Sequence, residues 1–258
     1  MSEKNKLVAF MSIVLLCAVF VVTTLFSSCD DNDSDETDYR DKSANEKRTD
    51  KESKKQENGE SFDYTIVVDA GHGGVDPGKV GVNGQLEKDI NLQIAVKLKA
   101  ILEQSEDVSI KVILTRDSDM GYYKDSDSNK KNADMRKRCE IVNGADADML
   151  VSIHQNSYHS PSVKGAQVFY YDESEEGHRL ATSIQQKLVS HLVKDGKGRV
   201  EKANDNYYIL LNVKCPAVIV ECGFLSNPDE AVKLSSEEYQ EQVAKAIADG
   251  VISYYLED

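Results

Sequence analysis

Short runs of β-branched and apolar residues alternate with longer segments of helical apolar spacing, and this alternation is the strongest constraint on the fold. Several of the runs are apolar at successive positions, as expected for strands buried on both faces. Strand followed by helix, repeated, predicts a single α/β domain: a mostly parallel twisted sheet flanked by helices on both faces. The predicted strands lie at 64–69, 109–115, 148–154, 166–171 and 217–222, and the predicted helices at 87–103, 133–143, 175–193 and 237–256.

The ends of the chain differ from this pattern. Residues 1–29 contain a short basic region and then an apolar run of roughly twenty residues, about the length that spans a bilayer. Two interpretations stay open: an uncleaved membrane anchor, or a lipoprotein signal whose lipidated residue is Cys29. A buried core helix is disfavoured because the run has no polar face. The lysines before the run predict that the rest of the chain lies on the extracytoplasmic face of a bacterial membrane.

Residues 30–61 are almost entirely polar and charged. Such a segment buries too little apolar surface to offset the entropy of ordering, so a disordered tether is predicted. Residues 62–258 are then predicted to form the single globular domain. The formal net charge of −14 argues against nucleic acid as a partner, because a basic surface is the usual footprint of that interaction.

Cysteine spacing gives no sign of a structural zinc site. Cys139, Cys215 and Cys222 show no C-x-x-C spacing. Buried thiols are the favoured interpretation, and a disulfide between Cys215 and Cys222 is the alternative for a domain outside the cell.

Polar side chains follow three of the predicted strands. His72 comes after the first strand, His154 ends the run MLVSIH, and Glu221 ends the run AVIVE. In open α/β sheets, ligands bind outside the carboxyl ends of the strands, so these residues are expected to converge. Glu87 joins them because it lies three residues before Ile90 on the inward stripe of its helix. A glutamate that only stabilises the helix N-terminus is the alternative for Glu87.

Two imidazoles and a carboxylate with an open fourth position form the ligand set of many catalytic zinc sites. We therefore predict zinc bound by His72, Glu87 and His154. The neighbouring glycines in AGHGG let the chain turn sharply and approach a substrate closely. Glu221 is then suited to act as general base and acid for a metal-activated water. Its alternative is a salt bridge to Arg116 or Arg138.

Several segments together resemble the zinc-dependent N-acetylmuramoyl-L-alanine amidases of bacterial cell walls. They are IVVDAGHGGVDPG, LEKDINL, LTRDSD, MLVSIHQNS, GAQVFYY and PAVIVECGFLSNPDE. The resemblance implies peptidoglycan as substrate, zinc on His72, Glu87 and His154, and Glu221 as the catalytic carboxylate. It also implies that Arg116 and Arg138 are structural or orient the substrate.

Other features refine this resemblance. The short segment between His154 and Gly165 leaves no room for an inhibitory helix and is more similar to the spore-cortex branch of the family. Leu211 stands where a basic residue is common, which bears on substrate affinity. The sequence does not identify a protein activator. Two other functions remain open: a zinc carboxypeptidase or deacetylase acting on the wall, and an inactive, membrane-tethered wall-binding protein.

Overall fold

The strand β3 contains four β-branched residues in succession, 65–68, and lies between β4 and β5 in the sheet. A computed structural model describes residues 55–57, 60–194 and 197–256, which fall within one compact unit. Ile66, Val67 and Val68 are fully buried on β3, although their side chains alternate between the two faces. The central sheet consists of β3 (Tyr64–Ala70), β4 (Ile110–Leu114), β5 (Met149–Asn156), β6 (Gln167–Tyr170), β7 (Lys202–Ala203) and β8 (Ala217–Phe224).

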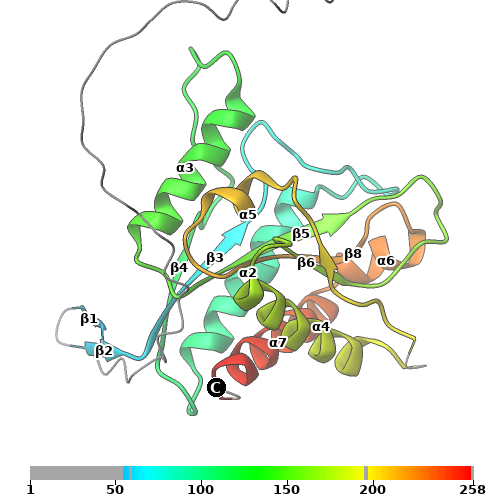
Figure 1. Cartoon of the computed structure of the whole chain (residues 1–258). Helices are drawn as coiled ribbons and strands as arrows, with labels where there is room; N and C mark the ends of the chain where they lie inside the picture. Colours follow the sequence, from blue (N-terminus) through cyan, green and yellow to red (C-terminus); the bar gives the residue numbers. More distant parts are fainter. Residues whose placement is uncertain (1–54, 58–59, 195–196, 257–258) are drawn as a thin grey trace, which may run out of the picture. The chain divides into compact units, whose positions relative to one another are not determined.

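The sheet order is β4-β3-β5-β8-β6-β7 (Figure 1). The pairs β3–β4, β3–β5 and β5–β8 are parallel, whereas β6 runs antiparallel to β8. The strands β3, β5 and β8 therefore end at the same edge, side by side. Any side chains just past their last core residues are brought together there.

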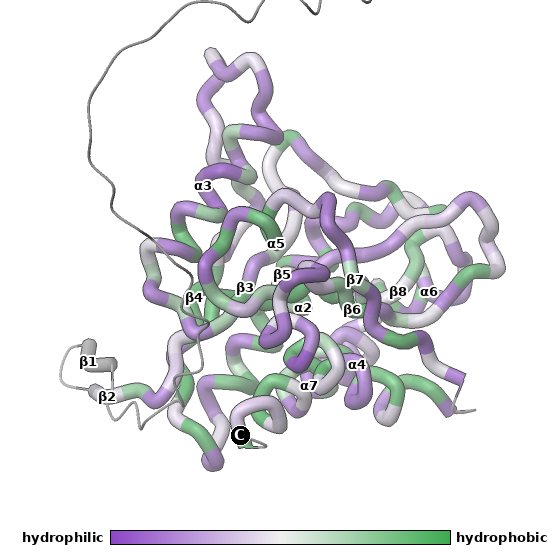
Figure 2. The backbone as a smooth tube through the Cα atoms, in the orientation of Figure 1, coloured by the Kyte–Doolittle hydropathy of each residue, from purple (hydrophilic) through white to green (hydrophobic). Residues whose placement is uncertain are grey.

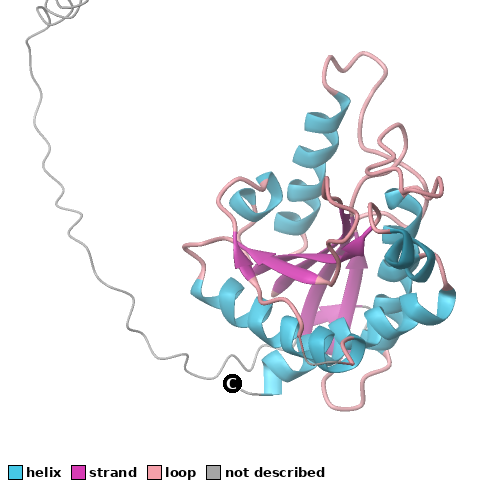
Figure 3. Ribbon diagram, turned by 90° about the vertical axis from the view of Figure 1, so that its right-hand side faces the viewer, coloured by secondary structure: helices cyan, strands magenta, loops and turns pink. Residues whose placement is uncertain are grey.

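Helices cover both faces of the sheet (Figure 3). On one face, α2, α4 and α7 pack on the larger apolar cluster, and on the other α3 and α5 pack on a smaller one. Hydrophobic residues concentrate along the strands and the inner helices (Figure 2). The helices are α2 (Glu87–Glu103), α3 (Lys130–Gly144), α4 (Glu175–Leu192), α5 (Tyr208–Asn212), α6 (Pro228–Leu234) and α7 (Glu237–Leu256).

The predicted α/β fold, a mostly parallel sheet with helices on both faces, is confirmed. The sequence did not indicate that β6 is antiparallel, and α5, α6 and β7 were not predicted. The helix α3 begins three residues earlier than predicted, at Lys130, because Asn129 caps it by accepting a hydrogen bond from the Asn132 amide.

The predicted tether, 30–61, ends differently from the expectation. Its last residues form an antiparallel hairpin of β1 (Lys55–Glu57) and β2 (Glu60–Phe62), in which main-chain pairing supplies order that composition alone did not indicate. The predicted membrane signal at 1–29, with Cys29, lies outside the described residues. Within the part of the chain that the structure describes, no helix is long and apolar enough to span a membrane.

Candidate metal centre

The loop after β3 turns sharply because consecutive residues in it have positive φ angles. His72 has a φ of 61°, a value that few residues with a Cβ adopt, and Gly73 and Gly74 follow with φ of 138° and 57°. Gly71 has a different reason to be glycine, because a Cβ there would lie 2.2 Å from Nε2 of His154. The glycines thus bring His72 and His154 close together.

Glu87 opens α2 with its side chain turned into the site instead of capping its own helix. Its Oε1 lies 3.0 Å from Nδ1 of His154 and 3.2 Å from Nε2 of His72. The same oxygen accepts a hydrogen bond from the Gln155 amide at 3.1 Å, and Oε2 accepts one from the Lys79 amide at 2.7 Å. These contacts fix a carboxylate between two imidazoles.

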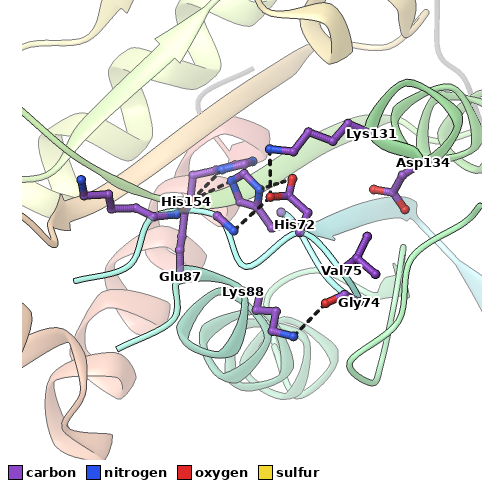
Figure 4. A network of polar contacts seen from close by, with 12 residues as sticks. His72, Gly74, Val75, Glu87, Lys88, Lys131, Asp134 and His154 are labelled. Carbon is purple, nitrogen blue, oxygen red and sulfur yellow. Dashed lines mark hydrogen bonds and ion pairs between the residues drawn. The ribbon is translucent and has the colours of Figure 1, made fainter. Parts of the chain in front are cut away.

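The three predicted ligand residues converge. One ligand atom from each of His72, Glu87 and His154 lies within 4.8 Å of the other two, and Figure 4 shows their side chains pointing toward one another. They come from the loop after β3, the start of α2 and the end of β5. Two nitrogens and one carboxylate oxygen at this spacing fit a divalent zinc ion by donor type and number.

The electrostatics of the three residues favour a cation. Burial alone would raise the pKa of Glu87, but hydrogen bonds and charge attraction from His154 and His72 hold it well below its usual range. Burial alone would lower the pKa of His154, but Glu87 raises it to about 9. The carboxylate is therefore ionised and attracts positive charge between the rings, the position that a metal ion would neutralise.

Glu221 lies beside His154, its register partner on the neighbouring strand. Its side chain is 8% exposed, and Oε2 has no hydrogen-bond partner among the described residues. Burial raises its pKa to about 7, with the His154 charge acting in the opposite direction. A buried carboxylate oxygen without a hydrogen-bond partner is costly and is typical of functional sites, so Glu221 is a candidate for a functional role.

The alternative of a salt bridge from Glu221 to an arginine is wrong, because both arginines are engaged elsewhere. Arg116 donates to the carbonyl oxygens of Ala70, Gly71, Ser118 and Lys88. Arg138 pairs with the carboxylates of Asp69 and Asp134 and donates to the carbonyls of Ala70 and His72. Both side chains are buried and donate hydrogen bonds to the backbone of residues 70–72, the segment that carries His72 and that we call the ligand loop. This role is structural.

Asp76 is a site residue that the sequence did not predict. Its Oδ2 lies 2.9 Å from Nδ1 of His72, and its Oδ1 lies 3.0 Å from Nζ of Lys131. Carboxylates commonly orient a ligating imidazole in this way by accepting from the ring nitrogen that faces away from the metal. The available signal was the carboxylate four residues after the histidine in GHGGVDPG.

A cavity of about 230 Å³ is lined by two of the three converging residues, His72 and His154. One wall comes from α3 and the other from the start of α5, and Glu221 is also a lining residue. Leu211 on α5 is 44% exposed and is not among the lining residues. The lining also includes Asp69, Gly71, His72, Gly73, Val75, Asp76, Tyr123, Lys130, Lys131, Asp134, Met135, Arg138, Ser152, His154, Tyr207, Tyr208, Ile209 and Ile219.

Two further expectations are settled by the same geometry. Cys215 precedes β8 and Cys222 is near its far end, and no disulfide joins them, so the alternative of a Cys215–Cys222 disulfide is wrong. Cys139 and Cys222 are buried, as expected, whereas Cys215 is half-buried. The segment between β5 and β6, residues 157–166, contains no helix.

An α/β sheet whose strand ends bring together two imidazoles and a carboxylate, beside a second buried carboxylate, defines the chain as a candidate metal-dependent hydrolase. A family model described as N-acetylmuramoyl-L-alanine amidase matches residues 66–253. The chain belongs to this family. The resemblance predicted from the motifs is thereby confirmed.

Individual relatives agree with the family assignment. The germination-specific N-acetylmuramoyl-L-alanine amidase of Bacillus subtilis is 36% identical over 195 residues, covering 74% of this chain and 80% of that protein. The solved structure of the CwlD amidase from Clostridioides difficile, in complex with the GerS lipoprotein, has a TM-score of 0.71 and 39% identity, covering 76% of this chain and 100% of that one. The amidase AmiC2 of Nostoc punctiforme has a TM-score of 0.65 and 34% identity, covering 76% of this chain and 98% of that one.

Proposed function

We propose that the chain hydrolyses the amide between the lactyl group of N-acetylmuramic acid and L-alanine in peptidoglycan, with zinc held by His72, Glu87 and His154. The family assignment supports the reaction. The observation that carries the chemistry is the convergence of three ligand atoms within 4.8 Å beside the unpartnered carboxylate of Glu221. No structural reason accounts as well for two imidazoles and two carboxylates at one sheet edge.

A zinc ion held by His72, Glu87 and His154 would lower the pKa of a water molecule and polarise the substrate carbonyl oxygen. Glu221 then serves as the proton carrier: its carboxylate takes a proton from the attacking water, which adds to the carbonyl carbon. The same proton passes to the nitrogen of L-alanine as the carbon–nitrogen bond breaks. Asp76 holds the His72 ring, and the arginines hold the backbone that carries it.

The competing hydrolase functions require a different recognition element. A carboxypeptidase needs a cation that is free to bind the terminal carboxylate of its substrate. Arg116 and Arg138 were the candidates for that cation, and both are buried in contacts with backbone carbonyls or aspartates. Neither arginine is therefore free to bind the terminal carboxylate that a carboxypeptidase recognises.

Mass spectrometry of digested peptidoglycan separates these functions. We expect the purified chain to release whole stem peptides that begin with L-alanine, leaving intact N-acetylmuramic acid on the glycan. Stems shortened from the carboxyl end would indicate a peptidase instead, and loss of acetyl groups would indicate a deacetylase. A chelator-treated sample is the control, with activity returning on addition of zinc. Absence of any cleavage in the zinc-loaded protein would favour the inactive wall-binding alternative.

We also propose that residues 1–29 place the enzyme on the extracytoplasmic face of the membrane, as an uncleaved anchor or through lipid on Cys29, and that most of the segment 30–61 is a tether. The support is the sequence pattern alone. Expression of the full chain and of Cys29→Ala in a bacterial host with radiolabelled palmitate tests the lipid. Label in the first and not in the second supports lipidation, and label in neither supports the anchor.

A further inference from the structure

The cavity beside the metal centre has two unlike walls. The first turn of α3 contributes Lys130 and Lys131, whereas the other wall is formed by Tyr207, Tyr208 and Ile209 at the start of α5. The helix α5 has the sequence YILLN and contains no charged residue. A substrate lying across this cavity therefore meets an apolar and aromatic surface on one side and cations on the other.

Lys131 lines this cavity and is linked to the candidate metal centre through the carboxylate of Asp76. Its Nζ lies 3.0 Å from Oδ1 of Asp76, whose Oδ2 lies 2.9 Å from Nδ1 of His72 (Figure 4). The side chain is nevertheless 69% exposed. An ammonium group has three donors, so Lys131 can keep Asp76 and still bind a second anion.

The other cations that line the cavity are less suited to bind an anion. Nζ of Lys130 pairs with Asp125 at 3.1 Å and lies 5.1 Å from the centre of the Tyr123 ring. Arg138 is 1% exposed and is paired with Asp69 and Asp134. Lys131 is therefore the most exposed of the lysines and arginines that line the cavity, and Asp76 links it to the His72 ring.

We propose that Lys131 is a specificity-determining residue that binds the free carboxylate of the second stem residue, D-glutamate. This inference rests on the proposed amidase function. The first stem residue, L-alanine, has no free carboxylate within the chain, whereas a γ-linked D-glutamate does. The second stem residue lies within about 7 Å of the first along an extended chain, and Lys131 lines the same cavity as His72. The methyl group of L-alanine would then face the apolar wall of α5.

A pair of substrates that differ in a single charge tests this proposal. The first is N-acetylmuramoyl-L-alanyl-D-glutamate with its γ-carboxyl blocked as a methylamide, so that only the α-carboxylate is free. The second is the same compound with D-isoglutamine, whose α-carboxyl is an amide, in place of D-glutamate. We expect the wild-type enzyme to prefer the acid about five-fold in kcat/KM, mainly through KM, because an exposed ion pair contributes about 1 kcal/mol or less. In Lys131→Gln the two substrates should have about equal kcat/KM, and in Lys131→Arg the preference for the acid should be retained.

Lys137→Gln is the matched control, because Lys137 is an exposed lysine of the same helix that pairs with Glu140 and does not line the cavity. It should keep the wild-type preference. Zinc content is measured in each variant, so that a lost preference is not confused with a lost metal. Equal cleavage of both substrates by the wild type, or an unchanged preference in Lys131→Gln, would overturn the inference while the amidase function stands. Cleavage of neither substrate by the zinc-loaded wild type would overturn the proposed function itself.

Discussion

Replacing Glu221 by Gln is expected to reduce kcat by between about 10² and 10⁴, the usual contribution of a general acid–base group. The amide has nearly the same shape but cannot take a proton from water. Because the carboxylate is buried with one oxygen unpartnered, removing its charge is not expected to unfold the protein. The measurement is the rate at which stem peptide is released from purified peptidoglycan, followed by liquid chromatography and mass spectrometry.

Two controls make the Glu221→Gln result specific. Zinc content should match the wild type, since Glu221 is not one of the three proposed ligands. Glu140→Gln, which changes an exposed glutamate on α3, should leave kcat unchanged. If Glu221→Gln kept more than about a tenth of the wild-type kcat at normal zinc content, Glu221 would not be the general base.

Replacing Arg138 by Met is expected to destabilise the fold by about 3 to 5 kcal/mol, the usual cost of removing one partner from a buried ion pair. Arg138 is 1% exposed, and its loss leaves the buried carboxylate of Asp69 without its cation. It also frees the carbonyls of Ala70 and His72, so the ligand loop loses its support. Urea unfolding of the wild type and the variant at pH 7 measures the difference.

The control for Arg138→Met is Lys137→Met, which removes an exposed cation from the same helix and should change stability by less than about 0.5 kcal/mol. The pH dependence gives a second check. Burial alone would raise the pKa of Asp69, but Arg138, Ser152 and Thr115 lower it to about 2. Because the pKa is depressed in the folded state, its stabilising contribution is complete above about pH 4 and is lost as the pH falls toward 2. In Arg138→Met this loss should begin at higher pH; equal stability of variant and wild type from pH 7 to 4 would contradict the role given to Arg138.

The sequence predicted that the proposed metal ligands and Glu221 lie together, because neighbouring parallel strands place their carboxyl ends at the same edge of the sheet. His72, His154 and Glu221 each follow or end an apolar run, and the carboxyl ends of β3, β5 and β8 meet at one edge. The apolar stripe of α2 gave the direction of Glu87. These are periodicities of the backbone, so they can be read without knowledge of tertiary contacts.

Other features depend on contacts that no local pattern encodes. The antiparallel direction of β6 was missed because a run of four to six apolar residues has the same appearance in either direction. The contact between Lys131 and Asp76 joins residues from separate elements, and Arg138 reaches back to the loop after β3. Lysine, arginine and aspartate are usually solvated surface residues, so their places at this site appear only once the chain is folded.

The most direct test of the account is the metal itself. We expect the purified protein to bind one zinc ion per chain, and zinc-edge X-ray absorption should show two imidazole nitrogens and a carboxylate oxygen at about 2.0 to 2.2 Å. His154→Ala should lose the ion under the same conditions. Absence of zinc, or an ion in the wild type whose coordination lacks imidazole, would contradict the central claim that His72, Glu87 and His154 form one metal site.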